Sequence, residues 1–439
     1  MTRFAVLGTG MAGFGAGHAL EAAGMPFVMY DRNSYYGGHT HSLRYDSGFV
    51  YDEGGHVSFT KHQHVKDLLA DNVKGEFEER RLGADNYWKG LRIPHPVQCH
   101  LSKLPADLNV AILTEYASQF GSPLRPDASY AEWLVGAYGK TFASTFPMVY
   151  GHKYHTTTMD RLTTDWIGPR MYRPSLEEVF RGAVAGAQQV NGAHYVDTFR
   201  YPKVGGFESY LAAFADRYEM RLSHRLVGID PKTKQLRFGD GKVDSYDEVV
   251  SSIPLPELVP LITGAPDDVR RAATQLAFTT AVLFNLGIDR DDLSDAGITY
   301  FYDEDIIFSR VNLPHLFSPR NAPPGCGTIQ AEVYFSDKYR PMPANPAELM
   351  DRVIADLKRA NFIRETDKIL LEDVAINRYA NVIYDVDRAA AVATIHGFLD
   401  DVGIHYCGRY GDWNHAWTDQ AFISGEEAAR KAVDAVSTR

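Results

Sequence analysis

A glycine-rich turn near the start of the chain constrains its fold more than any other feature. Gly8, Gly10 and Gly13 fit the pattern G-x-G-x-x-G directly after the strand-like run 3–7. In this pattern the first glycine permits a tight turn, the second lets the backbone approach a pyrophosphate, and the third lets the helix pack on the strand. The sequence therefore predicts a dinucleotide-binding unit in which the helix after the turn ends near Gly24.

An acidic residue and a second pair of glycines extend this unit. The strand predicted over 27–30 ends on Asp31, whose carboxylate can accept hydrogen bonds from ribose hydroxyls. Gly37 and Gly38, followed by His39, come six residues later. NAD binding does not require this second glycine pair. The motif therefore disfavours an ordinary NAD-dependent dehydrogenase.

Composition sets the outer limits of the prediction. The 439 residues have a formal net charge of −11, and 45% of them are apolar, which is typical of a globular chain with two or three domains. The acidic balance disfavours nucleic acid as a partner. Three scattered cysteines and dispersed histidines disfavour a disulfide framework and a metal site. We find no signal peptide and no apolar run of about 18 residues, so we expect no membrane span and a cytoplasmic location.

The order of predicted elements indicates an α/β fold with a discontinuous cofactor domain. Strand-like and helical runs alternate at both ends of the chain, whereas Leu101–Gly192 has the apolar spacing of helices. Strand candidates follow in the second half, with turns rich in glycine, aspartate and proline between them. The predicted domains are a Rossmann-type cofactor domain at 1–95, 200–265 and 395–439, a mainly helical domain at 96–199, and an antiparallel β-sheet domain at 266–394.

The second glycine pair and the segment 46–56 resemble FAD enzymes of the amine oxidase and protoporphyrinogen oxidase superfamily, which implies a GR2-like FAD-binding domain. A more specific resemblance is to UDP-galactopyranose mutases, in particular the eukaryotic type. Five blocks in order carry it, and they span most of the chain. They are G-G-H-V-S-F at 54–59, I-P-H-P-V-Q at 93–98, the segments 157–159 and 165–170, F-S-R-V at 308–311 with 318–319 and 332–333, and G-R-Y-G-D-W at 408–413 with 419–420.

This resemblance implies an isomerase that contains FAD but carries out no net oxidation or reduction. Members interconvert the pyranose and furanose forms of a nucleotide-linked sugar. The N5 atom of reduced FAD attacks the anomeric carbon and forms a flavin–sugar adduct while the nucleoside diphosphate departs. The implied partner is a nucleotide-diphosphate sugar, and NADPH or NADH is the expected reductant.

The resemblance also implies residue roles. Arg310 and Arg409 align with two arginines that hold the diphosphate, Tyr384 with a phosphate-binding tyrosine, and His56 with a histidine below the flavin. Arginine suits this task because its planar charged group binds phosphate oxygens in pairs. The implied substrate-binding residues are His95, Gln98, Trp166, Arg310, Tyr384 and Arg409. The implied cofactor-binding residues are Gly8, Gly10, Gly13, Asp31, Gly37, Gly38, His39, Gly55, His56, Arg170, Val227, Gly408, Asp419 and Gln420.

The chain departs from the mutase pattern at three places. His95 and His415 each stand where the family has a tyrosine, and the family triplet Q-D-H reads Thr-Asp-Gln at 418–420. UDP-galactose is therefore an expectation taken from the family. Two alternatives stay open: an FAD-dependent oxidase or desaturase of an amine, porphyrinogen or carotenoid-like substrate, and a noncatalytic protein with an FAD fold.

Overall fold

A parallel sheet of five strands carries the glycine-rich turn at its centre. The computed structural model describes residues 3–81, 83–184 and 198–437. Within this sheet every pair of neighbouring strands runs parallel. In sheet order the strands are β19 (Ile404–Tyr406), β13 (Glu248–Ser251), β1 (Phe4–Leu7), β2 (Phe27–Tyr30) and β9 (Met220–Arg221).

Both faces of this sheet are covered, which explains the unbroken apolar run of β1. Phe4 and Val6 pack into one core, and Ala5 and Leu7 pack into another, because successive side chains of a strand point to opposite faces. The core around Ala5 and Leu7 contains residues of two helices, α10 (Asp267–Gln275) and α13 (Arg388–Asp401). The core around Phe4 and Val6 contains residues of α1 (Met11–Ala22) and α15 (Thr418–Ser437).

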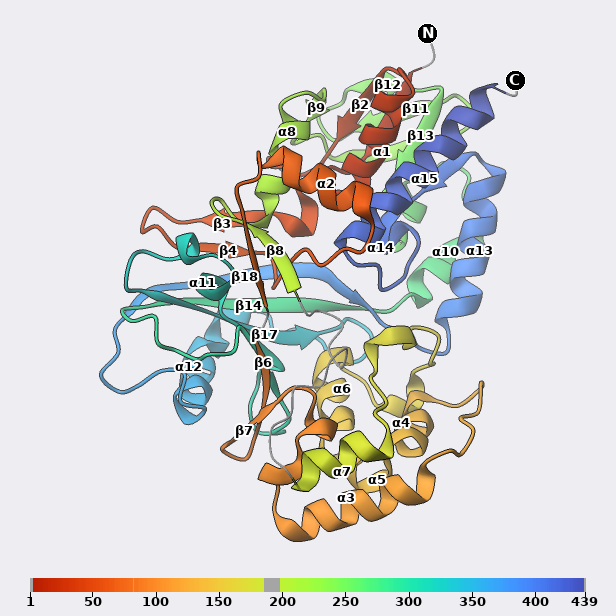
Figure 1. Ribbon diagram of the computed structural model, residues 1–439. Coiled ribbons are helices and arrows are strands. Elements are labelled where there is room, and N and C mark those ends of the chain that lie inside the picture. Colours follow the sequence, from red (N-terminus) through yellow and green to blue (C-terminus); the bar gives the residue numbers. More distant parts are fainter. Residues whose placement is uncertain (1–2, 82, 185–197, 438–439) are drawn as a thin grey trace.

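The first and last long helices, α1 and α15, lie against each other, so the two ends of the chain meet in one domain (Figure 1). Their contact depends on two glycines. A Cβ atom on Gly15 would lie 1.9 Å from the carbonyl oxygen of Phe422, and one on Gly425 would lie 1.9 Å from that of Ala12. Backbone therefore packs on backbone at this crossing.

A second sheet of seven strands forms the middle layer of the molecule (Figure 1). Its neighbouring strands run antiparallel, except that β15 and β6 run parallel. Helix α12 (Met350–Arg359) packs on it through Val353 and Leu357. In sheet order the strands are β18 (Ile369–Val382), β14 (Phe278–Ile288), β17 (Gly327–Phe335), β16 (Arg310–Asn312), β15 (Ile298–Phe301), β6 (Ala84–Trp88) and β7 (Leu91–Pro94).

Two strands of this sheet come from the segment 1–95, which the sequence assigns to the cofactor domain. Strand β6 pairs with β15, so residues 84–94 belong to the sheet that 278–382 builds. Sequence order alone does not reveal this pairing because more than 200 residues separate the partners. We therefore propose that the first cofactor-domain segment ends before β6.

Helices form the third layer, around a core of their own that includes Ile112, Leu134 and Phe142 (Figure 1). Helices are expected over 101–192, and the structure has helices in this segment as far as Val184. Residues 185–192 lie outside the described part. The capping box of Ser129 and Glu132 fixes the start of α4. The helices are α3 (Ala106–Gln119), α4 (Tyr130–Tyr138), α5 (Lys140–Thr145), α6 (Pro147–His155) and α7 (Leu176–Val184).

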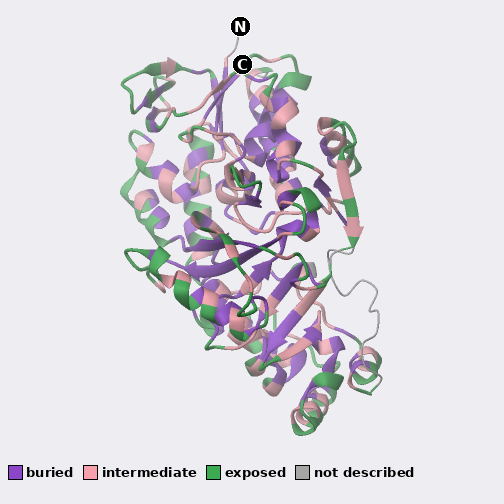
Figure 2. Cartoon of the chain, turned by 90° about the vertical axis from the view of Figure 1, so that its left-hand side faces the viewer, coloured by how far each residue is buried: buried purple, intermediate pink, exposed green. Residues whose placement is uncertain are grey.

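Buried residues concentrate in the two large sheets and on the helix faces that cover them (Figure 2). In the described part of the chain, no helix combines the length and the apolar character needed to cross a lipid bilayer. The remaining elements are β3 (Ser42–Arg44), β4 (Val50–Asp52), α2 (Gln63–Asn72), β5 (Phe77–Arg81), β8 (Thr198–Pro202), α8 (Ala212–Ala215), β10 (Leu226–Asp230), β11 (Gln235–Phe238), β12 (Val243–Ser245), α9 (Leu255–Leu258), α11 (Pro314–Phe317) and α14 (Gly408–Gly411), with short 3-10 turns between them.

Candidate functional site

A cavity of about 1160 Å³ lies where the carboxyl ends of the parallel strands meet the seven-stranded sheet. The turns after β1, β2, β13 and β19 line one side, and β16, β17 and β18 line the other. Open α/β sheets bind their ligands at the carboxyl ends of strands. The predicted site residues that line this cavity are Gly8, Gly10, Asp31, Gly37, Gly38, His39, Gly55, His56, Arg170, Arg310, Gly408 and Arg409.

The glycine-rich turn leaves the start of α1 open toward the cavity. Gly8 has a φ of 107°, and the Gly37 N–H donates to the carbonyl of Thr9 at 2.8 Å, so the two glycine segments lie against each other. No side chain caps α1, and its first turn contains no acidic residue. The free N–H groups and the positive end of the helix dipole thus suit a pyrophosphate. Gly13 does not line the cavity but allows α1 to pack on the turn, because a Cβ there would lie 2.0 Å from the Gly8 oxygen.

Asp31 stands at the edge of the cavity in a fixed orientation. Its Oδ2 accepts hydrogen bonds from the N–H and the hydroxyl of Thr9, both at 2.8 Å, and its Oδ1 accepts one from the N–H of Asn33 at 2.9 Å. A carboxylate has about four acceptor positions, so this one keeps a position for a ribose hydroxyl. This geometry suits the role predicted for Asp31.

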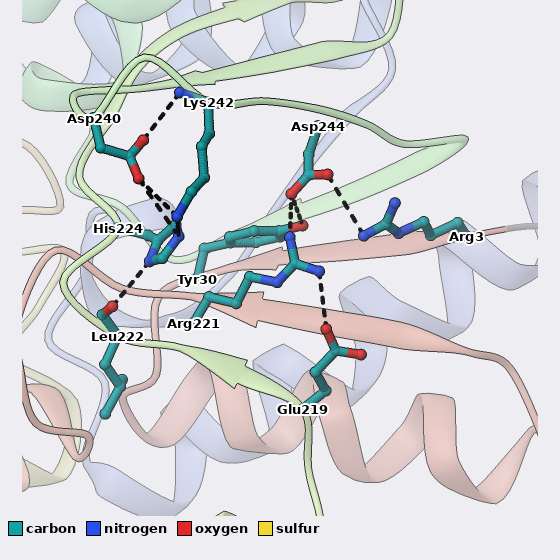
Figure 3. A network of polar contacts seen from close by, with 9 residues as sticks. All are labelled: Arg3, Tyr30, Glu219, Arg221, Leu222, His224, Asp240, Lys242 and Asp244. Carbon is teal, nitrogen blue, oxygen red and sulfur yellow. Dashed lines mark hydrogen bonds and ion pairs between the residues drawn. The ribbon is translucent and has the colours of Figure 1, made fainter.

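Beyond Asp31 a polar network supports the end of the cavity (Figure 3). His224 lines the cavity and lies 3.4 Å from the Nζ atom of Lys242, which pairs with Asp240 at 3.0 Å. Val227, predicted to bind the cofactor, lies on β10 with 49% of its surface exposed and does not line the cavity, whereas its neighbour Leu226 does. Successive side chains of a strand point to opposite faces, and on β10 Leu226 rather than Val227 faces the cavity.

His56 lies in the part of the cavity that also contains Arg310. Its Nδ1 atom is buried and has no hydrogen-bond partner among the described residues. Burial, assisted by His39 and Arg310, lowers the pKa of His56 to about 4, so the ring is neutral at physiological pH. The preceding residue must be small, because a Cβ on Gly55 would lie 2.7 Å from the Oδ1 atom of Asn312.

Arg310 projects from β16 and is held by a buried carboxylate on β17. Its Nε and Nη2 atoms donate to the two oxygens of Glu332 at 2.9 and 2.8 Å. Glu332 is 1% exposed and also accepts hydrogen bonds from Tyr334 and from Asn312. Burial opposes the charge of Arg310, but the Glu332 carboxylate outweighs it and holds the pKa of Arg310 well above its usual range. The pair is thus ionised and close to neutral overall.

Arg409 lies on α14, and only neutral groups contact it. Its Nη1 donates to the carbonyl of Ala416 at 3.0 Å, and its Nη2 donates to the Oδ1 atom of Asn381 at 2.7 Å. Within the described part of the chain, its buried Nε has no hydrogen-bond partner and no carboxylate lies within 4 Å of its guanidinium. Arg409 therefore contributes an uncompensated positive charge to the cavity.

Tyr154, at the end of α6, lies among the arginines of the site. Its hydroxyl donates to the same Asn381 oxygen at 2.7 Å. Burial raises the pKa of Tyr154, while the charges of Arg409, Arg310 and Arg170 act against that rise. The sequence analysis missed Tyr154 and Asn381, although each lies within three residues of a motif position, Tyr154 before 157–159 and Asn381 before Tyr384.

A second cavity of about 510 Å³ adjoins the first. Arg170, His415 and Ala416 line both, and the guanidinium of Arg170 lies 4.2 Å from the ring centroid of Trp417. Among the predicted residues, Trp166, Tyr384 and Gln420 line this smaller cavity instead of the larger one.

Besides Gly13 and Val227, three predicted residues line neither cavity. The side-chain amide of Gln98 donates to the carbonyl of Tyr172 at 2.9 Å. The ring of His95 lies 3.1 Å from the Oδ1 atom of Asn86. Asp419 lies at the start of α15 and is 9% exposed. The residues on either side of the pair 419–420 line the larger cavity, but Asp419 itself does not.

FAD fits the larger cavity as the described residues shape it. The open start of α1 suits the pyrophosphate and Asp31 suits the ribose. The unpaired nitrogens of Arg409 and His56 give polar contacts along the rest of the cavity. In the described part of the chain, no three histidine, cysteine, aspartate or glutamate residues form a group that could hold a metal ion.

Comparison with known proteins agrees with this fit. The chain matches the family of flavin containing amine oxidoreductases over residues 11–433. The structure of reduced UDP-galactopyranose mutase superposes with a TM-score of 0.92 at 22% identity, covering 99% of this chain and 96% of that chain. A candidate protoporphyrinogen oxidase from Exiguobacterium sp. 255-15 gives 0.73 at 17% identity, with 98% of each chain covered. Putrescine oxidase bound to putrescine gives 0.67 at 14% identity, with 99% of each chain covered.

These similarities confirm the predicted α/β fold and the resemblance of that fold to UDP-galactopyranose mutase. At such identities the structural likeness concerns the fold, whereas the family match extends over nearly the whole chain. The chain therefore belongs to the flavin containing amine oxidoreductase family, and this membership implies FAD as its cofactor.

Proposed function

We propose that this protein is a flavin-dependent mutase that interconverts the pyranose and furanose forms of a nucleotide-diphosphate sugar without net redox change. The observation that carries the proposal is the placement of Arg409, Arg310 and Arg170 around Tyr154 in the cavity that fits FAD. A diphosphate is the anionic group that such a cluster suits best. The fold shared with UDP-galactopyranose mutase supports the same reading.

In this proposal Arg409 is the main stabiliser of the departing diphosphate. Charge grows on the diphosphate as its bond to the anomeric carbon breaks, and a fixed cation that is already in place stabilises that charge more than the ground state. Asn381 orients the guanidinium by accepting from Nη2, and Tyr154 orients Asn381 through the same oxygen. Arg310 is held rigidly by Glu332 and presents its remaining N–H groups as hydrogen-bond donors.

The cofactor would be held by the glycine-rich turn, Asp31 and Gly408, with NADPH or NADH as the proposed reductant. When bound and reduced, FAD supplies the nucleophile for the anomeric carbon. His56 remains neutral beside it, so it can accept or donate one hydrogen bond without adding charge. Trp166 and Tyr384 line the adjoining cavity, where they would contact parts of the substrate beyond the reacting carbon.

The second candidate is an FAD-dependent oxidase of an amine or porphyrinogen. Aromatic side chains favour it, since Tyr300, Tyr334 and Tyr410 line the cavity and can surround an organic substrate. A cationic amine, however, would be repelled by Arg409, whose charge no described carboxylate offsets.

Incubation of the dithionite-reduced protein with UDP-galactofuranose tests the proposal, with chromatographic separation of the pyranose product. We expect conversion by the reduced protein and none by the oxidised protein. Other nucleotide furanoses would follow if UDP-galactofuranose is not converted. Failure with all of them, together with peroxide formation from an amine, would establish the oxidase instead.

A further inference from the structure

His415 lies in the wall that separates the two cavities and is held there by aromatic contacts. Its ring stacks on Trp166 with centroids 5.5 Å apart and planes at 21°, and it meets the ring of Tyr384 at 5.0 Å. The residue is 8% exposed. Because it lines both cavities, this remaining exposed surface faces space that a ligand can enter.

The hydrogen bonding of His415 determines which of its nitrogens carries a proton. The Nε2 atom lies 2.8 Å from the carbonyl oxygen of Val382, and a carbonyl can only accept, so Nε2 carries hydrogen. Burial, together with Arg409 and Arg170, lowers the pKa of His415 well below its usual range, so the ring is neutral. The Nδ1 atom must then present a lone pair, and no described residue donates a hydrogen bond to it.

This lone pair is a poor partner for a phosphate and a good one for a hydroxyl. Phosphate oxygens at neutral pH have lone pairs of their own and no hydrogen to donate, so they are repelled by a bare ring nitrogen. The neighbouring Arg170 and Arg409 are donors only, whereas the Nδ1 atom of His415 is an acceptor. Arg409 lies beside it and belongs to the diphosphate end of the site rather than to the end predicted for the base.

Resting on the proposed function, we infer that the Nδ1 atom of His415 accepts a hydrogen bond from a hydroxyl group of the hexose and so selects the sugar. The tyrosine of the mutase motif carries a hydroxyl that can donate, whereas this ring nitrogen can only accept. The exchange therefore changes the kind of group that the wall recognises.

Fluorinated ligands test this inference on the unaltered protein. In each analogue of UDP-galactose, one hexose hydroxyl is replaced by fluorine, which keeps nearly the same size but cannot donate a hydrogen bond. We expect one analogue to bind the flavin-loaded protein about 10-fold more weakly than UDP-galactose, because Nδ1 is then left without a donor. Equal affinity of every analogue for the wild type would overturn the inference.

A variant shows whether the lost contact involves His415. In His415→Phe the aromatic stack remains but the acceptor is gone, so UDP-galactose should bind about 10-fold more weakly while UDP binds within twofold of wild type. The analogue that is weak in wild type should no longer differ from UDP-galactose in the variant. Equal losses for UDP and UDP-galactose would mean that His415 contacts the nucleotide portion, which contradicts the inference.

His396→Phe is the matched control for packing and stability. His396 also lies against a backbone carbonyl, that of Gly411 at 2.9 Å, and stacks on Tyr406 at 3.9 Å, but it lines neither cavity. Its substitution should leave both affinities unchanged. If the wild type binds no nucleoside diphosphate and no nucleotide-diphosphate hexose, the proposed function fails and this inference fails with it. Binding of both by the wild type without the pattern above overturns the inference alone.

Discussion

Arg310 and Arg409 line the same cavity but differ in what surrounds their charges. Arg310 projects from a strand of the seven-stranded sheet and forms two hydrogen bonds to Glu332, so its charge is largely cancelled where it stands. Arg409 follows a strand of the parallel sheet and contacts a carbonyl and an amide oxygen, which are neutral. The attraction of the cavity for an anion should therefore come mainly from Arg409, and the rigidity of its wall mainly from Arg310.

The difference between the two arginines explains how an acidic protein can bind an anionic ligand. A protein with a net charge of −11 can bind a diphosphate if one cation in its cavity is left uncompensated. The sequence analysis assigned both arginines the same role, the binding of the diphosphate. Only the neighbouring carboxylate separates their roles.

The largest effect is expected for Arg409→Ala. In the proposed mutase this charge is the main stabiliser of the departing diphosphate, so kcat/KM should fall by about 1,000-fold. Arg409→Lys keeps the charge but loses the paired donors, so its loss should be smaller. Steady-state kinetics of the reduced protein with UDP-galactofuranose measures both. Equal activity of Arg409→Ala and wild type would contradict the assignment.

Arg310→Ala should act mainly on stability. Removing the guanidinium leaves the buried Glu332 carboxylate without its cation, which costs about 3 to 5 kcal/mol of unfolding free energy. Urea unfolding followed by circular dichroism measures this change. The double variant Arg310→Met with Glu332→Leu is the control, since it removes both charges and should recover most of the lost stability. No recovery would show that the ion pair is not the cause.

Glu332→Gln should unmask the charge of Arg310. The cavity gains a net positive charge, so UDP should bind roughly up to 10-fold more tightly, and less so at high salt. Titration of the flavin-loaded protein with UDP at two salt concentrations measures this effect. Weaker binding in the variant would show that Glu332 positions Arg310 for the diphosphate more than it neutralises it.

The smallest effect concerns His56, which lies close to Arg310. Its pKa of about 4 in the folded protein is below the value of about 6.5 expected in the unfolded chain. The unfolded chain therefore takes up this proton first, and folding stability falls as the pH drops from about 6.5 toward 4. His56→Gln should reduce that fall by about 1 kcal/mol. Unfolding measured at pH 7 and at about pH 5.7 tests this, and an unchanged pH dependence would exclude it.

Much of the fold could be predicted from the sequence because its signals are local. The turn at Gly8 and the strand 27–30 both depend on neighbouring residues, and the structure has each of them. The membership of β6 in the seven-stranded sheet could not be predicted, because its partner β15 is more than 200 residues away.

Site residues could be predicted where they belong to a motif. They were harder to predict where their role depends on a contact that forms only in the folded protein. Arg310 and Arg409 follow from motifs, and both line the cavity. Gln98 belongs to a motif as well, yet its amide is directed to the carbonyl of Tyr172, which only the packing of the helical layer determines. Asn381 was missed because its function depends on Tyr154, a residue on a distant helix.

The most direct test of a mutase without net redox chemistry is the number of product molecules formed for each pair of electrons supplied. The protein would be reduced once with a measured amount of dithionite, kept free of oxygen and given excess UDP-galactofuranose. We predict many molecules of pyranose for each pair of electrons, because the electrons are not consumed. A yield of no more than one molecule per pair of electrons would contradict a mutase and indicate a redox enzyme.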